Sequence, residues 1–513
     1  MNFDVTIIGF GVIGMESLFK LTQKLNKKRV FKIAIIEKDI KKVPGGVAYN
    51  KLDSKFGFFN NPLRLSSPEF IKWIKKEKNI DKLLKFINDN KDYNLDRWLI
   101  DNKDFVNKKI NKFSEIYFPR LTYSFFLEEK LRKIIYNISK KKIVVKFYHS
   151  ELSNINKNNF LVCTTKTNLK EYKPTIEFEK IKFNLIGIKN FKSFNTKKII
   201  LGNGLLPPKI IKEKINFKND NYIWDFYTEG GTLNLINKIK KINLKKKNIK
   251  IIFIGDKAGL LETMLELENL INKFNININI IAIAPKSLSL EKAELSSKFN
   301  SFKFKFLINN NIKKLNKSHE ILKLLIKEFN YSKKKGFNKY DVWTWILKKE
   351  LMFKCYKKLS IHEKKKYNDI TFPLIRNITR YTYPSTIYSK KRLERKKVLK
   401  FIKDKVTKLE KFKKFIKITT QNRKKISADI VINVSGPVSL EKANKEVIFI
   451  NSLKKLFHNF NNRGFTVNKD FLIGENIYAP GTISSNFNPN RLTIIKAITM
   501  NSHVVVNKIL KAK

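Results

Sequence analysis

Residues 3–14 read FDVTIIGFGVIG, and residues 33–38 read IAIIEK. An apolar run that ends in glycines, then a helical pattern, then a second apolar run is typical of a β-α-β unit. We expect the first strand to end at Gly9 and the helix to run from Met15 to about Leu25. This stretch predicts a parallel sheet at the start of the chain, and with it an α/β fold.

The glycines of this turn have the spacing G-x-G-x-x-G, and each has its own steric task. Gly9 makes the tight turn, Gly11 lets the backbone approach a pyrophosphate, and Gly14 lets the helix pack close to the sheet. The second strand ends at Glu37 and Lys38, where a carboxylate accepts hydrogen bonds from a ribose diol. The pattern predicts binding of the adenosine half of a dinucleotide. The alternative is an ordinary glycine-containing turn followed by an accidental acid.

The same pattern returns in the middle of the chain. Residues 248–254 form an apolar run that ends at Gly255, and a helix and another apolar run follow. Lys257 replaces the second glycine, and Pro285 and Lys286 replace the acid. In one interpretation Lys257 contacts phosphate and Lys286 accepts a 2′-phosphate, which favours NADP over NAD. In the other, this second unit is structural and binds nothing.

Length and charge restrict the class of protein. A chain of 513 residues predicts two or three domains, and 42% hydrophobic residues are enough for substantial cores. The net charge of +63 comes almost entirely from Lys, used together with much Asn, Ile and Phe. All four have A/T-rich codons, so a biased genome explains the excess, and an adaptive basic surface is the alternative. The lysines are spread along the chain, so we expect no specific nucleic-acid partner, only non-specific attraction to polyanions.

Several kinds of site have no support in the sequence. Cys163 and Cys355 fit no metal-ligand spacing. The histidines, which are His149, His319, His362, His458 and His503, form no close pair, so we expect no metal centre.

Targeting and membrane segments have no support either. Asp4 stands where a signal peptide would be basic, and no stretch reaches about eighteen uncharged apolar residues. A soluble cytoplasmic protein without a membrane segment is expected.

Further motifs occur in a fixed order along the chain. They are the glycine loop Val43–Asn50, the N-x-P element Asn60–Pro62, the element Phe118–Tyr123 (FPRLTY), the strand Ile199–Gly204, the strand Val431–Pro437, and the late strand and glycine turn Asn476–Ile483. In this order they resemble the two-dinucleotide-binding flavoproteins. The closest resemblance is to the FAD/NAD(P)-binding oxidoreductase family that includes certain bacterial FAD-dependent urate hydroxylases.

The resemblance implies an α/β fold with two Rossmann-like dinucleotide-binding domains. The FAD domain would be discontinuous, with its first part over residues 1–215 and its second over residues 438–513. A degenerate, NAD(P)-type domain would occupy residues 216–437 and carry a helical insertion at about 302–400.

The resemblance also assigns cofactor-binding residues. The turn glycines would bind the FAD diphosphate, Glu37 and Lys38 would lie at the adenosine ribose, and the loop from Gly45 to Tyr49 would lie on the flavin side. Gly481 would lie in the returning segment that touches the ribityl chain, with Thr482 where relatives place an acid. The complete set is Gly9, Gly11, Gly14, Glu37, Lys38, Gly45, Gly46, Tyr49, Asn61, Arg120, Gly204, Gly255, Gly481 and Thr482; Asn61 and Arg120 are expected near the isoalloxazine or the diphosphate.

The expected function is that of an FAD-dependent oxidoreductase. An NAD(P)H-dependent flavin monooxygenase on a small polar or heterocyclic substrate fits best, because such chemistry needs few protein acids and no catalytic triad, carboxylate pair or metal cluster is visible. One alternative is a flavoprotein oxidase or reductase without bound NAD(P). Another is a non-catalytic basic protein that binds polyanions. The sequence assigns neither catalytic residues nor an oligomeric state.

Overall fold

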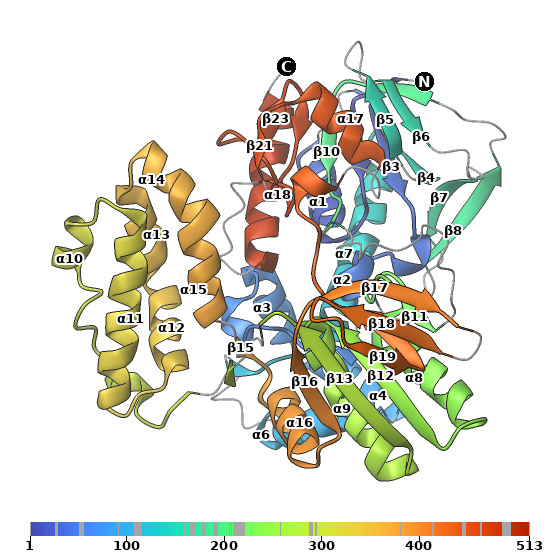
Figure 1. Ribbon diagram of the computed structural model, residues 1–513. Helices are drawn as coiled ribbons and strands as arrows, with labels where there is room; N and C mark the ends of the chain where they lie inside the picture. The colour runs from blue at the N-terminus through green and yellow to red at the C-terminus, as the bar shows by residue number, and fades with distance from the viewer. Residues whose placement is uncertain are drawn as a thin grey trace.

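A computed structural model of the chain arranges it around two large sheets, one mixed and one parallel, with a separate group of helices at one side (Figure 1). No helix in the part of the chain that it describes is both long and apolar enough to cross a membrane. The structure describes residues 2–25, 29–50, 56–90, 92–106, 115–150, 152–156, 161–164, 170–176, 181–187, 193–204, 206, 208, 221–256, 258–286, 291–292, 295–379, 381–412, 415–443, 448–461, 464–484 and 494–511.

The first sheet has the strand order β23-β24-β10-β2-β3-β4-β7-β8 among the described residues. Strands β24, β10, β2, β3 and β4 are parallel, so their carboxyl ends meet at one edge. Their bounds are β2 (Val5–Ile8), β3 (Phe31–Glu37), β4 (Ile143–His149), β7 (Lys170–Ile176), β8 (Ile181–Gly187), β10 (Ile199–Leu201), β23 (Leu472–Gly474) and β24 (Ile477–Tyr478).

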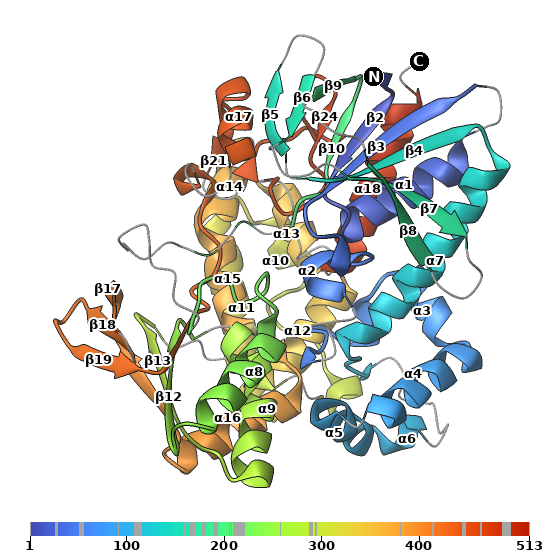
Figure 2. The same cartoon turned by 90° about the vertical axis from the view of Figure 1, so that its right-hand side faces the viewer.

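The predicted β-α-β unit is confirmed at the start of the chain. Helix α1 (Val12–Lys24) begins three residues earlier than expected, because Gly11 already serves as its N-cap. It packs between α7 (Arg120–Lys140) and α18 (Ile494–Lys511), so the first and last helices lie side by side and both chain ends lie near the first sheet (Figure 2).

The apolar patterns at Ile143–Tyr148, near Phe160–Thr164 and near Lys182–Gly187 predict a small antiparallel insertion with a hairpin loop at Asn154–Asn159. This prediction is wrong for the first strand, because β4 pairs in parallel with β3 and extends the main sheet. Antiparallel pairing occurs between β5 and β6, in a small sheet of order β1-β9-β6-β5, and between β4, β7 and β8 in the main sheet. Strand β5 continues to Asn156, so the loop starts later than predicted. The bounds are β1 (Asn2–Phe3), β5 (Leu152–Asn156), β6 (Leu161–Thr164) and β9 (Ser193–Thr196).

The second sheet has the order β11-β20-β12-β13-β16, and every neighbouring pair is parallel. Its apolar residues alternate between two covered faces. Ile251 and Phe253 of β12 pack with the helices α8, α9 and α16, whereas Ile252 and Ile254 pack with the antiparallel strands β17, β18 and β19. The bounds are β11 (Tyr222–Ile223), β12 (Asn248–Ile254), β13 (Asn277–Ala284), β16 (Leu399–Lys403), β17 (Val406–Lys411), β18 (Ile416–Thr420), β19 (Lys425–Ala428), β20 (Ile430–Asn433), α8 (Gly231–Asn243), α9 (Ala258–Phe274) and α16 (Pro384–Arg395).

The helical segment expected at about 302–400 divides into two parts. The first part forms a helical lobe beside the sheets (Figure 1), with α10 (Asn309–Lys313), α11 (Ser318–Lys334), α12 (Lys339–Lys348), α13 (Leu351–Lys358), α14 (Ile361–Lys366), the π-helical turn Tyr367–Thr371 and α15 (Phe372–Ile378). The second part, α16 and β16, belongs to the second sheet and its helical cover. A buried carboxylate orders the lobe, because Glu328 accepts the backbone N–H groups of residues 305–307.

Short elements connect these layers. They are η1 (Ile40–Lys42), α2 (Gly46–Tyr49), η3 (Leu63–Leu65), α3 (Pro68–Ile74), α4 (Glu77–Asn90), α5 (Tyr93–Asp101), α6 (Lys103–Val106), β14 (Glu291–Lys292), η5 (Phe299–Ser301), β15 (Tyr381–Thr382), η7 (Leu440–Lys442), α17 (Ile448–Leu456), β21 (Phe460–Asn461) and β22 (Gly464–Phe465).

Buried charges join the helices that cover the first sheet. Lys130 of α7 lies 2.6 Å from Glu16 of α1 and 2.6 Å from Glu69 of α3. His503 of α18 lies 4.0 Å from Glu16. Burial, together with Lys20 and Lys130, lowers the pKa of His503 to about 4. The folded protein therefore keeps this imidazole neutral.

We predict that His503 makes the fold sensitive to mild acid. The pKa of His503 falls from 6.5 to about 4 on folding, so the unfolded chain binds the extra proton and stability is lost as pH falls through this window. In urea titrations from pH 7 to pH 4.5, His503→Gln should lose about 2 kcal/mol less free energy of unfolding than the native chain. His362→Gln, at an exposed position, is the control. Equal losses in both variants would contradict the assignment.

Candidate dinucleotide-binding site

The carboxyl edge of the first sheet is built from backbones in close contact. Gly9 has a φ of +88°, and a Cβ there would lie 2.9 Å from the carbonyl group of Gly202 at the end of β10. A Cβ on Gly14 would lie 2.3 Å from the Gly9 carbonyl oxygen. No side chain fits at either position, so the turn presents its backbone to the open edge and α1 starts close against the sheet.

Glu37 lies at this edge as the last residue of β3. Its Oε2 accepts the Phe10 N–H at 2.7 Å, and its Oε1 accepts the Asp39 N–H at 2.9 Å. Burial raises the pKa of Glu37 and outweighs these two bonds, which lower it. The Lys38 side chain is exposed, and its carbonyl lies 3.0 Å from His149 Nε2 at the end of β4.

The loop Gly45–Tyr49 lies directly against the turn. Gly45 and Gly46 have φ values of +107° and +63°, and a Cβ on Gly46 would lie 3.0 Å from the Cα of Gly11. The Tyr49 ring contacts Phe59 and Tyr123, with centroids 5.9 and 5.1 Å away. The structure therefore brings the loop and the glycine turn together.

The returning segment completes the edge. A Cβ on Gly481 would lie 2.3 Å from Ile13 Cδ1 in the first turn of α1, and the Thr482 hydroxyl donates to the Gly204 carbonyl at 3.1 Å. A Cβ on Gly204 would meet open space, and Asn203 Oδ1 is buried with no hydrogen-bond partner in the structure. Open space beside an unpaired polar atom fits a bound polar group. The sequence interpretation missed Gly202 as a site residue; its signal is a strand that ends in glycine next to Gly9.

Two further candidates, Asn61 and Arg120, lie near the loop Gly45–Tyr49. Asn61 is half-buried in the turn after Phe59, whose ring contacts Tyr49, so this turn lies beside the loop. Arg120, at the start of α7, is directed at the second unit. Its Nη2 bonds to the Glu262 carboxylate of α9, and its Nε donates to the Phe58 carbonyl at 3.1 Å.

A buried polar contact therefore joins the two units. Burial lowers the pKa of Arg120, but the Glu262 carboxylate outweighs it, so the pKa is raised and the guanidinium stays charged. Tyr227 donates to the same carboxylate at 3.4 Å. Lys42, next to the glycine loop, donates to the Thr228 carbonyl at 2.7 Å. The second unit is thus held against the loop of the first.

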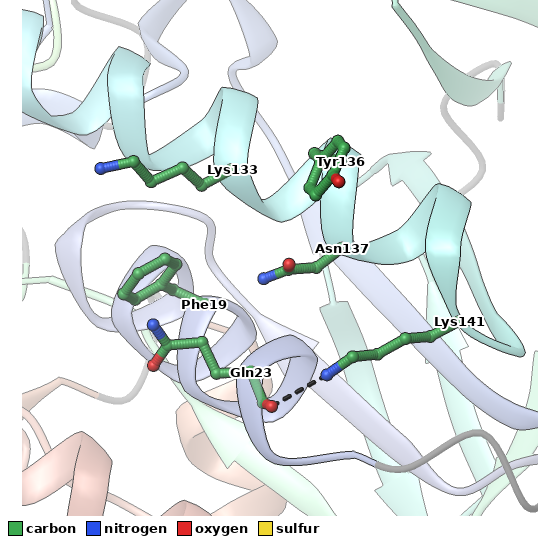
Figure 3. A pocket seen from close by; sticks show the side chains of 6 residues that line it. All are labelled: Phe19, Gln23, Lys133, Tyr136, Asn137 and Lys141. Atoms are coloured by element: carbon green, nitrogen blue, oxygen red, sulfur yellow. Dashed lines mark hydrogen bonds between the residues drawn. The ribbon is translucent and has the colours of Figure 1, made fainter.

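Two cavities bear on where a ligand would bind. A cavity of about 20 Å³ lies at the junction of the units, between Val47, Ala48 and Arg120 on one side and Phe226, Tyr227 and Glu262 on the other. A larger surface groove of about 430 Å³ runs between α1 and α7 (Figure 3). In that groove Lys141 caps the end of α1 by donating to the Gln23 carbonyl at 2.8 Å. The groove lies at the carboxyl end of α1, away from the glycine turn, so it is no part of the dinucleotide site.

The second unit repeats the backbone of the turn. Gly255 has a φ of +113°, and its N–H donates to the Ile283 carbonyl at 2.8 Å, just as the Gly9 N–H donates to Ile36. Asp256 is buried and bonds to Lys390 Nζ of α16 at 3.1 Å. Lys257 lies outside the described residues, so its contact with phosphate stays a prediction. Lys286 is exposed just after β13.

Metal chemistry has no visible basis in this region. In the portion of the chain that the structure describes, no group of three or more His, Cys, Asp or Glu side chains is placed to hold an ion.

We predict that the Arg120–Glu262 pair holds the two units together. Both side chains are about 13–14% exposed, so Glu262→Gln leaves a buried guanidinium without its counter-charge and should lower the free energy of unfolding by about 3 kcal/mol. The double variant Arg120→Met with Glu262→Leu should lose clearly less. Urea denaturation followed by circular dichroism measures both.

The exposed pair Lys408–Glu410 provides the control, since Glu410→Gln should change stability by less than about 1 kcal/mol. A double variant as unstable as Glu262→Gln alone would show that the pair is not a coupled unit.

Comparisons with known proteins bear on the N-terminal unit. Residues 6–173, less than half of the chain, match a family model described as FAD-NAD(P)-binding. No curated protein matches the sequence.

Three solved structures align along nearly all of the chain. The ornithine hydroxylase of Pseudomonas aeruginosa has 11% identity and a TM-score of 0.48, covering 100% of this chain and 99% of that one. The FAD-bound cadaverine monooxygenase of Erwinia amylovora has 9% identity and a TM-score of 0.47, covering 100% and 95%. The lysine monooxygenase of Nocardia farcinica has 10% identity and a TM-score of 0.46, covering 98% and 99%. Over residues 6–173, the chain is therefore similar to the FAD-NAD(P)-binding family.

Proposed function

We propose that this protein is an FAD-dependent oxidoreductase, specifically an NAD(P)H-dependent flavin monooxygenase that acts on a small polar or heterocyclic substrate. One observation carries the proposal: the second β-α-β unit is docked on the flavin-side loop of the first. Val47 and Ala48 of that loop share a cavity with Phe226 and Tyr227 of the second unit. Hydride transfer between two dinucleotides needs their reactive rings in contact, and this junction is where such rings would meet.

The proposal divides the chain as follows. Residues 1–215 and 438–513 form a discontinuous FAD-binding domain, and residues 216–437 form the NAD(P)-type domain with the helical insertion. The membership of the two large sheets supports this division. Strands β2, β3, β4, β7, β8, β10, β23 and β24 share one sheet, whereas β11, β12, β13, β16 and β20 share the other.

Each part of the first edge has a task towards FAD. The backbone of Gly9, Gly11 and Gly14, with the N-terminus of α1, would hold the diphosphate. The ribose hydroxyl groups would donate hydrogen bonds to the Glu37 carboxylate, either in addition to the Phe10 and Asp39 N–H groups or in their place. Bound FAD supplies hydride acceptance and reaction with dioxygen.

The side chains around the junction would orient the bound cofactors and substrate and exclude water, rather than transfer protons. Arg120 and Tyr227 are both committed to Glu262, and burial raises the pKa of Tyr227 above its ordinary value. The aromatic wall of Tyr49, Phe59 and Tyr123 excludes solvent beside the loop. Arg120, Tyr227 and Glu262 thus bond to one another, which agrees with flavin chemistry, in which the cofactor does the bond making.

The finer expectations belong to the proposal too. A urate-like planar heterocycle is the substrate suggested by the resemblance, and a cytoplasmic location and the absence of a specific nucleic-acid partner follow from the sequence alone. Function diversifies on a shared fold through the site, so the substrate is proposed only as a class.

The direct test is the visible spectrum of the purified protein after incubation with FAD and desalting. We expect a two-banded flavin spectrum that bleaches anaerobically with NADPH or NADH. Bands that persist with both would identify an oxidase or reductase without bound NAD(P). No bands in a protein with folded circular dichroism would overturn the proposal and favour a basic protein that binds polyanions.

Glu37 should contribute directly to FAD affinity. We predict that Glu37→Gln weakens FAD binding about tenfold, because hydrogen bonds from the ribose to a carboxylate are stronger than those to an amide. Fluorescence titration of the apoprotein measures the dissociation constant. The exposed Glu475 precedes β24 at the opposite edge of the sheet, and Glu475→Gln should leave it unchanged. An equal effect of both substitutions would exclude the assigned role.

A further inference from the structure

Building on the proposed function, we propose that the second unit selects a nicotinamide dinucleotide with a phosphate on the adenosine 2′-oxygen. Ala284, Lys286 and Lys403 are the residues that set this choice. The observation behind it is the strand register, which shows which residue of the second unit stands where Glu37 stands in the first.

The strand registers of the two units correspond residue by residue at their turns. In the first, Ile8 of β2 pairs with Ile36 of β3, and Glu37 comes next. In the second, Ile254 of β12 pairs with Ile283 of β13, and Ala284 comes next. The glycine after each first strand donates its N–H to the partner strand at the same distance, 2.8 Å. Ala284 therefore occupies the place of Glu37; the sequence alone had assigned that place to Pro285 and Lys286.

The neighbouring strand extends the comparison. Glu37 pairs with His149 on β4, and Ala284 pairs with Lys403 on β16. The second unit thus has a methyl group in place of the carboxylate and a lysine in place of the histidine. Lys403 and Lys286 are both exposed, and both lie at the carboxyl edge of the sheet.

These exchanges change what the edge recognises. A carboxylate accepts hydrogen bonds from a ribose diol but repels a 2′-phosphate, which carries close to two negative charges. An alanine removes both the acceptor and the repulsion. Two ammonium groups then attract the phosphate as point charges.

The acidic residues nearby do not cancel this attraction. Asp256 follows Gly255 as Phe10 follows Gly9, and like Phe10 it is turned into the core, where it bonds to Lys390. Asp404 is buried and follows Lys403, so it lies on the opposite face from Lys403, the face where Ile402 packs with the antiparallel strands, and its Oδ1 accepts the Lys405 N–H at 2.7 Å. Neither carboxylate faces the edge beside Ala284.

The test compares two ligands of equal charge. Adenosine 2′,5′-bisphosphate and adenosine 3′,5′-bisphosphate are titrated by calorimetry into the full chain saturated with FAD, at one fixed ionic strength. Non-specific attraction to this very basic protein is the same for both isomers. We expect the 2′,5′ isomer to bind at least about tenfold more tightly. Equal affinities would overturn the inference.

Variants locate the effect. Lys286→Ala and Lys403→Ala should each reduce the isomer preference several-fold, and Ala284→Glu should abolish it by placing a carboxylate against the phosphate. Lys286→Glu tests the same charge reversal at an exposed position, in case Ala284→Glu does not fold. The control is Lys133→Ala, which removes an exposed lysine on α7, far from the second sheet, and should preserve the preference. If Lys286→Ala and Lys133→Ala behaved alike, the assignment would be wrong.

This result is separable from the proposed function. A chain that fails to bind FAD but keeps the isomer preference would overturn the flavoenzyme proposal and support the 2′-phosphate site. A chain that binds FAD but shows no isomer preference would support the flavoenzyme proposal and overturn the 2′-phosphate site.

Discussion

The close approach of three backbones at the end of β2 is the constraint on which the rest of the structure depends. Gly9, Gly14 and Gly202 pack so tightly that a single added methyl group would overlap a neighbouring carbonyl. This contact sets the distance between α1, β2 and β10. It also excludes side chains from Gly9 and Gly14 next to the N-terminus of α1, which is the condition for binding a phosphate group by backbone alone.

The other parts of the edge come from distant segments, and their arrival follows from this contact. The loop with Gly46 lies against Gly11, and Gly481 lies against the first turn of α1. Only small residues allow these approaches, so the glycines along the chain mark where separate segments meet. The buried Glu16–Lys130 pair lies behind α1 and, together with the more exposed Glu69, joins it to α3 and α7, which keeps the helix in position.

The two β-α-β units share a backbone but differ in the chemistry of their edges. In the first, Glu37 is held by two N–H groups beside an open edge. In the second, the equivalent position is Ala284, and the buried Asp256 is used within the core. Between the units, the Arg120–Glu262 pair replaces solvent with a charge-assisted contact, and the bond from Lys42 to the Thr228 carbonyl adds to it, so polar contacts help to fix their relative position. A junction held in this way lets one unit present a ligand to the other.

The sequence by itself determined the β-α-β units, because their signals are local: apolar runs of strand length, glycines at fixed spacing, and an acid about twenty residues later. It placed Gly9, Gly11, Gly14 and Glu37 on one turn and its facing strand. Only the tertiary structure decided three further features. Strand β4 joined the parallel sheet, Arg120 turned towards Glu262 in another unit, and Ala284 took the place of Glu37. Each depends on strand register or on contacts between residues more than a hundred positions apart, and no local pattern contains that information.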